Sequence, residues 1–159
     1  MLYGWRSRFI VLTPRGTRRL AESVDIPIAG GEGVNDLERF NEMLTSGGWD
    51  IIQPDVIRAG GILPTWKAAL LAEAHHRLCI LAHVRWPGLQ LLGAIPNCTH
   101  FEWMHDPPRL QTMFSEKILK EPIEIKDGYV KIPQGPGLGI TLNEEGITKY
   151  RIKETVSIS

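Results

Sequence analysis

The sequence has few cysteines, no excess of either charge and no long hydrophobic run. Its 159 residues contain 18 Lys and Arg against 18 Asp and Glu, and this balance disfavours nucleic acid or an anionic membrane as the main partner. The longest early apolar run, residues 9–12, is too short for a signal-peptide core or a membrane span. We therefore expect a soluble, cytoplasmic protein that has neither nucleic acid nor membrane as a partner.

Only two cysteines are present, Cys79 and Cys98, and both lie in apolar stretches without a CxxC spacing. Disulfides are rare in reducing compartments, and a structural zinc site needs more closely spaced ligands. Two buried thiols are therefore the preferred interpretation, and a disulfide is the alternative.

Acidic residues are absent before Glu22, whereas the first 19 residues carry five arginines. A basic, acid-free leader is typical of a transit peptide or an anion-binding arm, and a solvated basic surface is the simpler alternative. We separate residues 1–15 as an atypical basic leader.

From Gly16 onward, short apolar runs alternate with amphipathic stretches. The apolar runs predict strands over residues 26–29, 49–53, 79–82 and 99–102. The stretches between them predict helices over residues 16–23, 37–44, 64–76 and 88–95. This alternation is typical of βαβ units in a parallel sheet. The predicted class is α/β, either part of a (β/α) barrel or an open doubly wound sheet, because a complete barrel needs about 250 residues.

The pattern changes after residues 106–108, which read Asp-Pro-Pro. Strand-like alternation and a Pro/Gly stretch follow, and then a short helix near residues 143–150. We therefore divide the remaining chain into a partial barrel over residues 16–115 and a small α+β tail over residues 116–159.

One ionisable residue follows each predicted strand: Glu32, Asp55, His83 and Glu102. Any one of them, taken alone, is equally well explained as a solvated charge. Four in succession at equivalent places are harder to explain in that way, because working residues of parallel sheets gather at the carboxyl ends of the strands. These four residues are the predicted site.

The residue types indicate the chemistry of this site. Glu32 is a hard oxygen ligand suited to Mg²⁺. Asp55 on one strand can fix the tautomer of His83 on the next, which makes the imidazole a general base. Glu102 can act as an acid or polarise a bound carboxylate.

Competing sites in the sequence are weaker. His75 and His76 are adjacent on a predicted helix, so their side chains point about 100° apart and cannot easily share a metal. The glycine-rich residues 30–33 and 135–139 lack the spacing of nucleotide-binding loops. The four residues that follow the predicted strands therefore stay the preferred candidate site.

Several motifs in fixed order resemble the enolase superfamily. They are Ile-Pro-Ile-Ala-Gly-Gly-Glu at 26–32, Asp-Ile-Ile-Gln-Pro-Asp at 50–55, Gly-Gly-Ile at 60–62, Ala-His at 82–83, Pro-Asn at 96–97, Glu-Trp at 102–103, Asp-Gly-Tyr at 127–129 and Pro-Gly-Leu-Gly at 136–139. Together they resemble the carboxyl-terminal half of the mandelate racemase/muconate lactonizing enzyme-like subgroup, over residues 16–152.

The resemblance implies the C-terminal half of a TIM-type barrel, about four βα units, with the tail packed on an amino-terminal capping domain. It implies that Glu32 is a Mg²⁺ ligand, that Asp55 and His83 move a proton α to a carboxylate, and that Glu102 hydrogen-bonds that carboxylate. The implied activity is acid-sugar dehydration by a lyase, or racemisation or epimerisation of a 2-hydroxy acid by an isomerase.

The sequence also departs from the family pattern. The capping domain, barrel strands one to three, the Lys-x-Lys base and the first metal carboxylate have no counterpart here. At the place of the second carboxylate, residues 5–8 read Trp-Arg-Ser-Arg, and a cation there would repel Mg²⁺. A frameshift, a mis-set start or a decayed gene is the hypothesis that accounts for this stretch.

We accordingly expect a truncated chain with little or no family activity by itself. Its open strand edge and uncovered apolar faces predict a homo-oligomer. One alternative is a non-catalytic half barrel that oligomerises or docks on a partner. Another is a fragment that complements a separately encoded amino-terminal half.

Overall fold

The structure is a computed structural model and describes residues 5–6, 13–83, 86–102, 117–121, 123 and 125–152. The chain divides into two compact units, a first unit of residues 1–104 and a second unit of residues 105–159. The boundary predicted at residue 115 lies outside the described residues. None of the described helices has both the length and the hydrophobicity that crossing a bilayer requires.

A parallel sheet of short strands lies at the centre of the first unit. Its strands are β1 (Trp5–Arg6), β2 (Ile28–Gly30), β3 (Ile51–Ile52) and β4 (Leu78–Cys79). They lie side by side in chain order, with Arg6 opposite Ala29, Ala29 opposite Ile51, and Ile52 opposite Cys79. Sequential order without reversal fits a barrel segment, because doubly wound sheets reverse their strand order.

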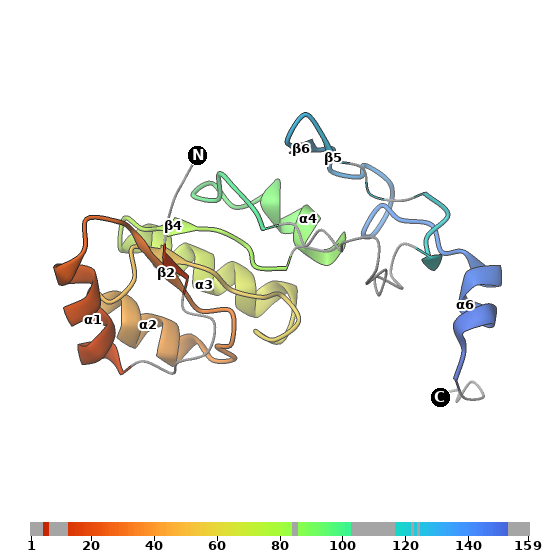
Figure 1. Cartoon of the computed structure of the whole chain (residues 1–159). Helices are drawn as coiled ribbons and strands as arrows, with labels where there is room; N and C mark the ends of the chain where they lie inside the picture. The colour runs from red at the N-terminus through yellow and green to blue at the C-terminus, as the bar shows by residue number, and fades with distance from the viewer. Residues whose placement is uncertain are drawn as a thin grey trace. The chain divides into compact units, whose positions relative to one another are not determined.

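Helices connect or follow these strands, as Figure 1 shows. They are α1 (Pro14–Ser23), α2 (Leu37–Thr45), α3 (Ile62–Ala74) and α4 (Trp86–Leu92). The Thr13 side chain accepts the Gly16 N–H at 3.1 Å, so α1 begins before the predicted Gly16. Asp36 caps α2 by accepting the Arg39 N–H at 2.6 Å. Each cap satisfies a backbone donor that the first turn leaves unpaired.

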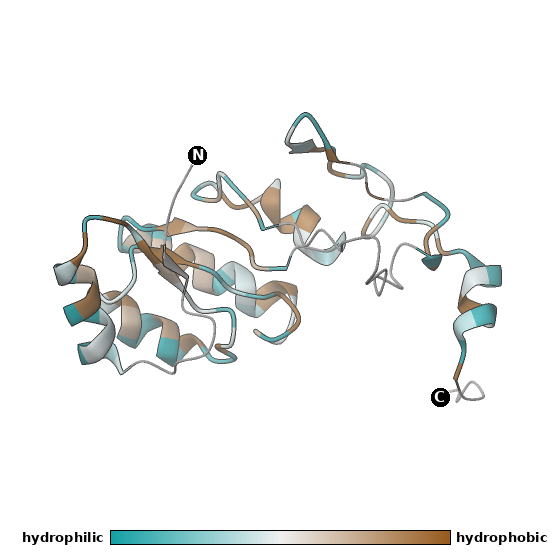
Figure 2. Ribbon diagram, in the orientation of Figure 1, coloured by the Kyte–Doolittle hydropathy of each residue, from teal (hydrophilic) through white to brown (hydrophobic). Residues whose placement is uncertain are grey.

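The core of the first unit lies between the sheet and the helices. Its most deeply buried large side chains come from strands, from helices and from the segment after β4: Ile28, Phe40, Met43, Ile52, Leu81 and Leu89. Alanines on α3 are also fully buried, and their small size lets the helix approach its neighbours closely. Figure 2 shows hydrophobic colours along the central strands and hydrophilic colours on parts of α1 and α2.

The last predicted strand of the barrel segment is much shorter than expected. Isolated bridges pair Asp55 with Ala82 and Leu81 with Phe101 in parallel, so the prediction of a strand over residues 99–102 was wrong in extent. The preceding residues bond within their own turn: the Cys98 N–H donates to the Ile95 carbonyl at 3.2 Å. Such local bonds compete with a strand ladder.

The second unit contains a two-stranded hairpin and the short helix that was predicted near residues 143–150. Strands β5 (Ile125–Lys126) and β6 (Tyr129–Val130) pair antiparallel. The intervening Asp127 and Gly128 have φ angles of 52° and 80°, which are typical of the tight turns that an Asp-Gly pair forms. Helix α6 (Glu144–Tyr150) begins where Asn143 accepts the Gly146 N–H at 3.2 Å.

Candidate active site at the carboxyl ends of the strands

Glu32 lies in the turn directly after β2. The turn is closed by the Val34 N–H, which donates to the Gly31 carbonyl at 3.0 Å. Gly31 has a φ of 120°, and a Cβ atom there would lie 2.8 Å from a ring carbon of Phe40. Glycine is therefore needed at this position, and the resulting bend places the Glu32 carboxylate beyond the strand end.

Asp55 lies after β3 and is only 8% exposed. Its Oδ1 accepts the backbone N–H groups of Ile57 at 2.8 Å and Arg58 at 3.2 Å. Its Oδ2 lies 3.1 Å from Nδ1 of His83. The carboxylate is thus fixed by the local backbone on one side and faces the imidazole with the other.

His83 follows Ala82, the residue that bridges to Asp55. Its φ of 47° lies in the left-handed region, which is uncommon and costly for a residue with a Cβ atom. The Ala82 N–H donates to the Pro54 carbonyl at 3.0 Å, so the segment leading to His83 is held against the segment leading to Asp55. This pairing brings the two side chains together.

Glu102 completes the cluster from the last parallel segment. Its backbone N–H donates to the Leu81 carbonyl at 3.0 Å, and its Oε2 accepts the His83 backbone N–H at 3.2 Å. The same oxygen lies 3.9 Å from Nε2 of His83. The Oε2 atom of Glu32 approaches that nitrogen from another direction, at 3.7 Å.

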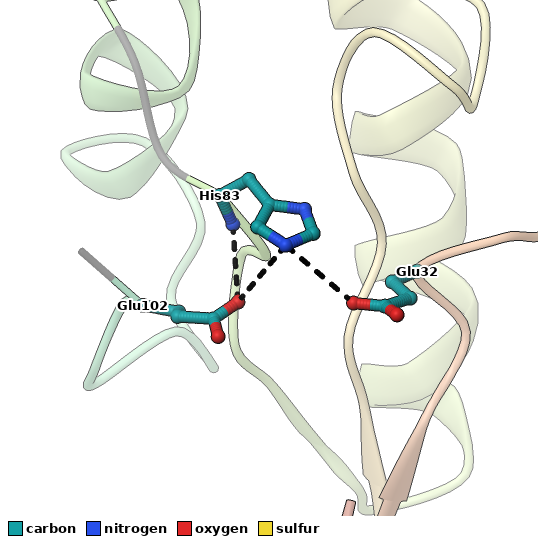
Figure 3. Close-up of side chains that lie close together, drawn as sticks. All are labelled: Glu32, His83 and Glu102. Carbon is teal, nitrogen blue, oxygen red and sulfur yellow. Dashed lines mark hydrogen bonds and ion pairs between the residues drawn. The ribbon is translucent and has the colours of Figure 1, made fainter. Parts of the chain in front are cut away.

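Figure 3 shows Glu32 and Glu102 on either side of the His83 ring. One ligand atom from each of the three residues lies within 4.8 Å of the others. The side chains are 15–25% exposed, so the cluster is enclosed but can be reached from solvent. Among the described residues, this is the group whose geometry could hold a metal ion.

The structure brings together all four residues that the sequence singled out. An imidazole whose Nδ1 faces a fixed carboxylate can present Nε2 as a proton acceptor, because the Nδ1–H···carboxylate bond sets the tautomer. The roles assigned to the individual residues remain predictions.

Sequence reasoning missed three features of this region. It predicted no strand at Trp5–Arg6, which pairs with β2, and no bond between the His83 backbone and Glu102. It also left out the side chain of Asn97, which donates to the carbonyls of Ala69 at 3.2 Å and Arg77 at 2.9 Å. Of these, only the Pro-Asn pair at 96–97 carried a sequence signal, as part of the family motif.

The two cysteines lie close to this region and are both free thiols. A hydrogen bond with Cys98, together with burial, raises the pKa of the Cys79 thiol. The bond with Cys79 lowers the pKa of the half-buried Cys98 thiol. Cys79 is buried, as predicted, whereas the prediction of a buried Cys98 is wrong, because that thiol is half-buried.

The chain matches a model of the enolase C-terminal domain-like family over residues 12–146. It is 32% identical over 146 residues to D-galactarolactone cycloisomerase of Agrobacterium fabrum, a match covering 86% of this chain and 38% of that protein. It is 31% identical over 137 residues to arabinonate dehydratase of Saccharolobus solfataricus, covering 85% of this chain and 36% of that protein.

The structure also resembles an enolase from Bradyrhizobium that was solved with magnesium and mandelic acid. The likeness has a TM-score of 0.79 at 26% identity and covers 94% of this chain and 39% of that one. This chain thus spans less than two fifths of the length of each of these three proteins. The partial barrel predicted from the sequence is confirmed.

Proposed function

The chain belongs to the enolase C-terminal domain-like family, and from this premise we propose that it carries the part of an enzyme that moves a proton α to a substrate carboxylate. Its relatives include an acid-sugar dehydratase and a sugar-lactone cycloisomerase. An acid sugar is therefore the substrate class we propose, and a 2-hydroxy acid such as mandelate is the alternative, which the mandelic acid in the related structure supports.

The pair formed by His83 and Asp55 is the observation that carries this proposal. Asp55 faces Nδ1 at 3.1 Å and is itself anchored by two backbone donors. A neutral imidazole held in this way takes the substrate proton on Nε2 and becomes an imidazolium, whose positive charge Asp55 stabilises. In dehydration, the resulting electron pair expels a β-hydroxyl group, which leaves as water once protonated.

Glu32 and Glu102 flank the atom that would receive the proton. We assign Glu102 to the substrate carboxylate, because its Oε2 lies 3.9 Å from Nε2 and a substrate α-carbon at Nε2 would place its carboxylate nearby. Glu32, on the opposite side at 3.7 Å, is the metal ligand implied by the resemblance.

Mg²⁺ dependence stays a prediction for this chain. Mg²⁺ takes about six ligands in an octahedron, nearly all of them oxygen. Of the four site residues, Glu32 alone is left for the ion once His83, Asp55 and Glu102 take the roles above, and one carboxylate does not supply such a shell. We therefore route no step of the proton transfer through this ion.

We further propose that this chain needs the amino-terminal part of its relatives for turnover. The relatives extend well beyond the region matched here, and substrate loops of this family lie largely in the capping domain. We also propose that the free chain self-associates, because it exposes large apolar side chains such as Ile57 at 70% and Leu63 at 63%.

The test combines the purified chain with the amino-terminal part of the Agrobacterium fabrum relative, with Mg²⁺ present, in deuterated water. Exchange of the α-proton of a panel of acid sugars is followed by NMR, and sedimentation of the free chain reports its association. We expect exchange only in the mixture, and we expect loss of that exchange with His83→Asn.

A matched control is His76→Asn, since His76 also has a positive φ, 55°, but is exposed and lies just after the end of α3 rather than at the end of a strand. Turnover by the chain alone would contradict the requirement for a second part. Unchanged exchange with His83→Asn in an active mixture would show that His83 is not the base.

A further inference from the structure

The two cysteines of the first unit come together from parts of the chain that lie far apart in sequence. Cys79 is the last residue of β4, and Cys98 follows a turn at residues 96–97. Their thiols share a hydrogen bond, and both are free. We propose that Cys98 is an oxidation site for hydroperoxides and that Cys79 converts the oxidised Cys98 into a disulfide between the two residues. This inference does not rest on the proposed function.

The backbone holds the two cysteines side by side. The Cys79 N–H donates to the carbonyl of Asn97 at 3.0 Å, which places the next residue, Cys98, beside Cys79. Further along the same two segments, Leu81 bridges to Phe101 in parallel. Neighbouring strands lie about 4.8 Å apart, and disulfides span Cα separations of about 4.4–6.8 Å. Formation of the bond therefore needs rotation of the two side chains and little movement of the backbone.

The surroundings of the two thiols give them different roles. Cys98 is half-buried, and Thr99 and His100 after it are exposed, so a small oxidant can reach the Cys98 sulfur. Cys79 is 0% exposed, and its thiol is bonded to that of Cys98. An oxidant therefore meets Cys98 first, and Cys79 acts second.

The protonation of the two thiols supports the same order. The hydrogen bond with Cys79 lowers the pKa of the Cys98 thiol against the effect of its burial, and backbone hydrogen bonds at Leu81 and His100 act in the same direction. The thiolate is the nucleophilic form of a cysteine. The hydrogen bond with Cys98, together with burial, raises the pKa of Cys79, so Cys79 stays protonated until Cys98 has reacted.

The oxidation takes two steps. The Cys98 thiolate attacks the hydroxyl oxygen of the hydroperoxide, the O–O bond breaks, and Cys98 becomes a sulfenic acid. The other peroxide oxygen leaves and takes a proton from water, so the sulfur loses two electrons and the peroxide gains two. The Cys79 sulfur then attacks the sulfenic sulfur, the S–S bond forms and the S–O bond breaks. The hydroxide that leaves combines with the Cys79 proton as water.

The disulfide would join β4 to the segment that leads into the site. Cys98 lies four positions before Glu102, whose N–H donates to the Leu81 carbonyl at 3.0 Å. A cross-link between residues 79 and 98 closes the intervening chain into a loop and reduces the conformations open to it. Oxidation of Cys98 therefore restricts local opening of the segment that carries Glu102.

The test treats the folded full chain, kept dilute, with hydrogen peroxide. Remaining thiols are blocked with N-ethylmaleimide after denaturation, and the peptides are identified by mass spectrometry without reduction. We expect a peptide pair linked through Cys79 and Cys98, loss of both free thiols, and recovery of both with dithiothreitol.

Variants separate the two roles. In Cys79→Ala, the sulfenic acid of Cys98 should accumulate and be trapped by dimedone. In Cys98→Ser, Cys79 should stay a free thiol at the same dose of peroxide. As a matched control, the double variant Cys98→Ser/Thr99→Cys moves the outer thiol by one residue and should give at least about 10-fold less linked peptide, because the geometry of a disulfide is specific.

Circular dichroism shows whether each variant is folded, and the parent chain decides the question where a variant is not. The inference is overturned if the linked peptides come from two different chains, or if Cys98 stays a thiol at doses that oxidise free glutathione. It is equally overturned if Cys98 proceeds to the sulfinic acid while Cys79 remains a free thiol.

Discussion

The two units of the chain differ in what holds them together. The first unit buries large side chains from strands and helices around one core, whereas Leu119 is the buried large hydrophobic residue among the described residues of the second unit. Hydrogen bonds between backbone groups connect the segments of the second unit instead. For example, the Lys120 N–H donates to the Thr141 carbonyl at 2.9 Å. Apolar packing positions the site, while turn and cap chemistry shapes the tail.

The largest expected effect is a cavity in the core of the first unit. Leu81 is fully buried and bridges to Phe101, next to Glu102. Leu81→Ala should lower the free energy of unfolding by about 2–5 kcal/mol, as measured by urea unfolding. As a control, Leu63→Ala removes a side chain that is 63% exposed, and its effect should stay within about 0.5 kcal/mol. Similar losses for both variants would contradict the core described here.

In the second unit, stability should depend instead on the close approach of Gly146 to the backbone of Lys117. A Cβ atom on Gly146, in the first turn of α6, would clash with the Lys117 carbonyl. Because the obstacle is backbone, Gly146→Ala should cost about 1–3 kcal/mol of local stability, despite the better helix propensity of alanine. Hydrogen exchange of the α6 amides should accelerate while that of β2 to β4 is unchanged. Equal protection of α6 in Glu145→Ala and Gly146→Ala would contradict this.

The reactivity of the two thiols shows whether Cys79 lies inside the core of the first unit and Cys98 at its edge. Because its pKa is lowered, Cys98 should be a thiolate at a lower pH than an ordinary cysteine and react with iodoacetamide there. Cys79 is fully buried and its pKa is raised, so it should react only after unfolding. Mass spectrometry after pulses across a pH series measures both. The pH midpoint of the Cys98 reaction should rise in Cys79→Ala, which removes the main cause of the shift.

The smallest expected effect is at the exposed end of the hairpin in the second unit. Tyr129 is 79% exposed, so Tyr129→Ala should change the free energy of unfolding by no more than about 0.5 kcal/mol. Thermal unfolding of the variant beside the parent chain measures this. A loss as large as that of Leu81→Ala would mean that Tyr129 is covered in solution.

Local chemistry explains which parts of the fold the sequence predicted. The apolar runs around Ile28 and Ile52 and the short helix near residues 143–150 depend on a few neighbouring residues, so their patterns can be recognised in the sequence. The first and last residues of the strands were harder to predict from the sequence. The segment after Pro96 bonds within its own turn, and β1 depends on pairing with β2, which no local pattern encodes.

The same division holds for the site. The order of residues is enough to place Glu32, Asp55, His83 and Glu102 after the parallel segments, because side-chain chemistry and position after an apolar run are properties of the chain. The folded chain is needed to show that Nε2 of His83 lies within 4 Å of two carboxylates while Nδ1 faces a third. Distances between residues far apart in sequence are fixed by strand register and by the left-handed backbone at His83, and these are set by packing across the whole unit.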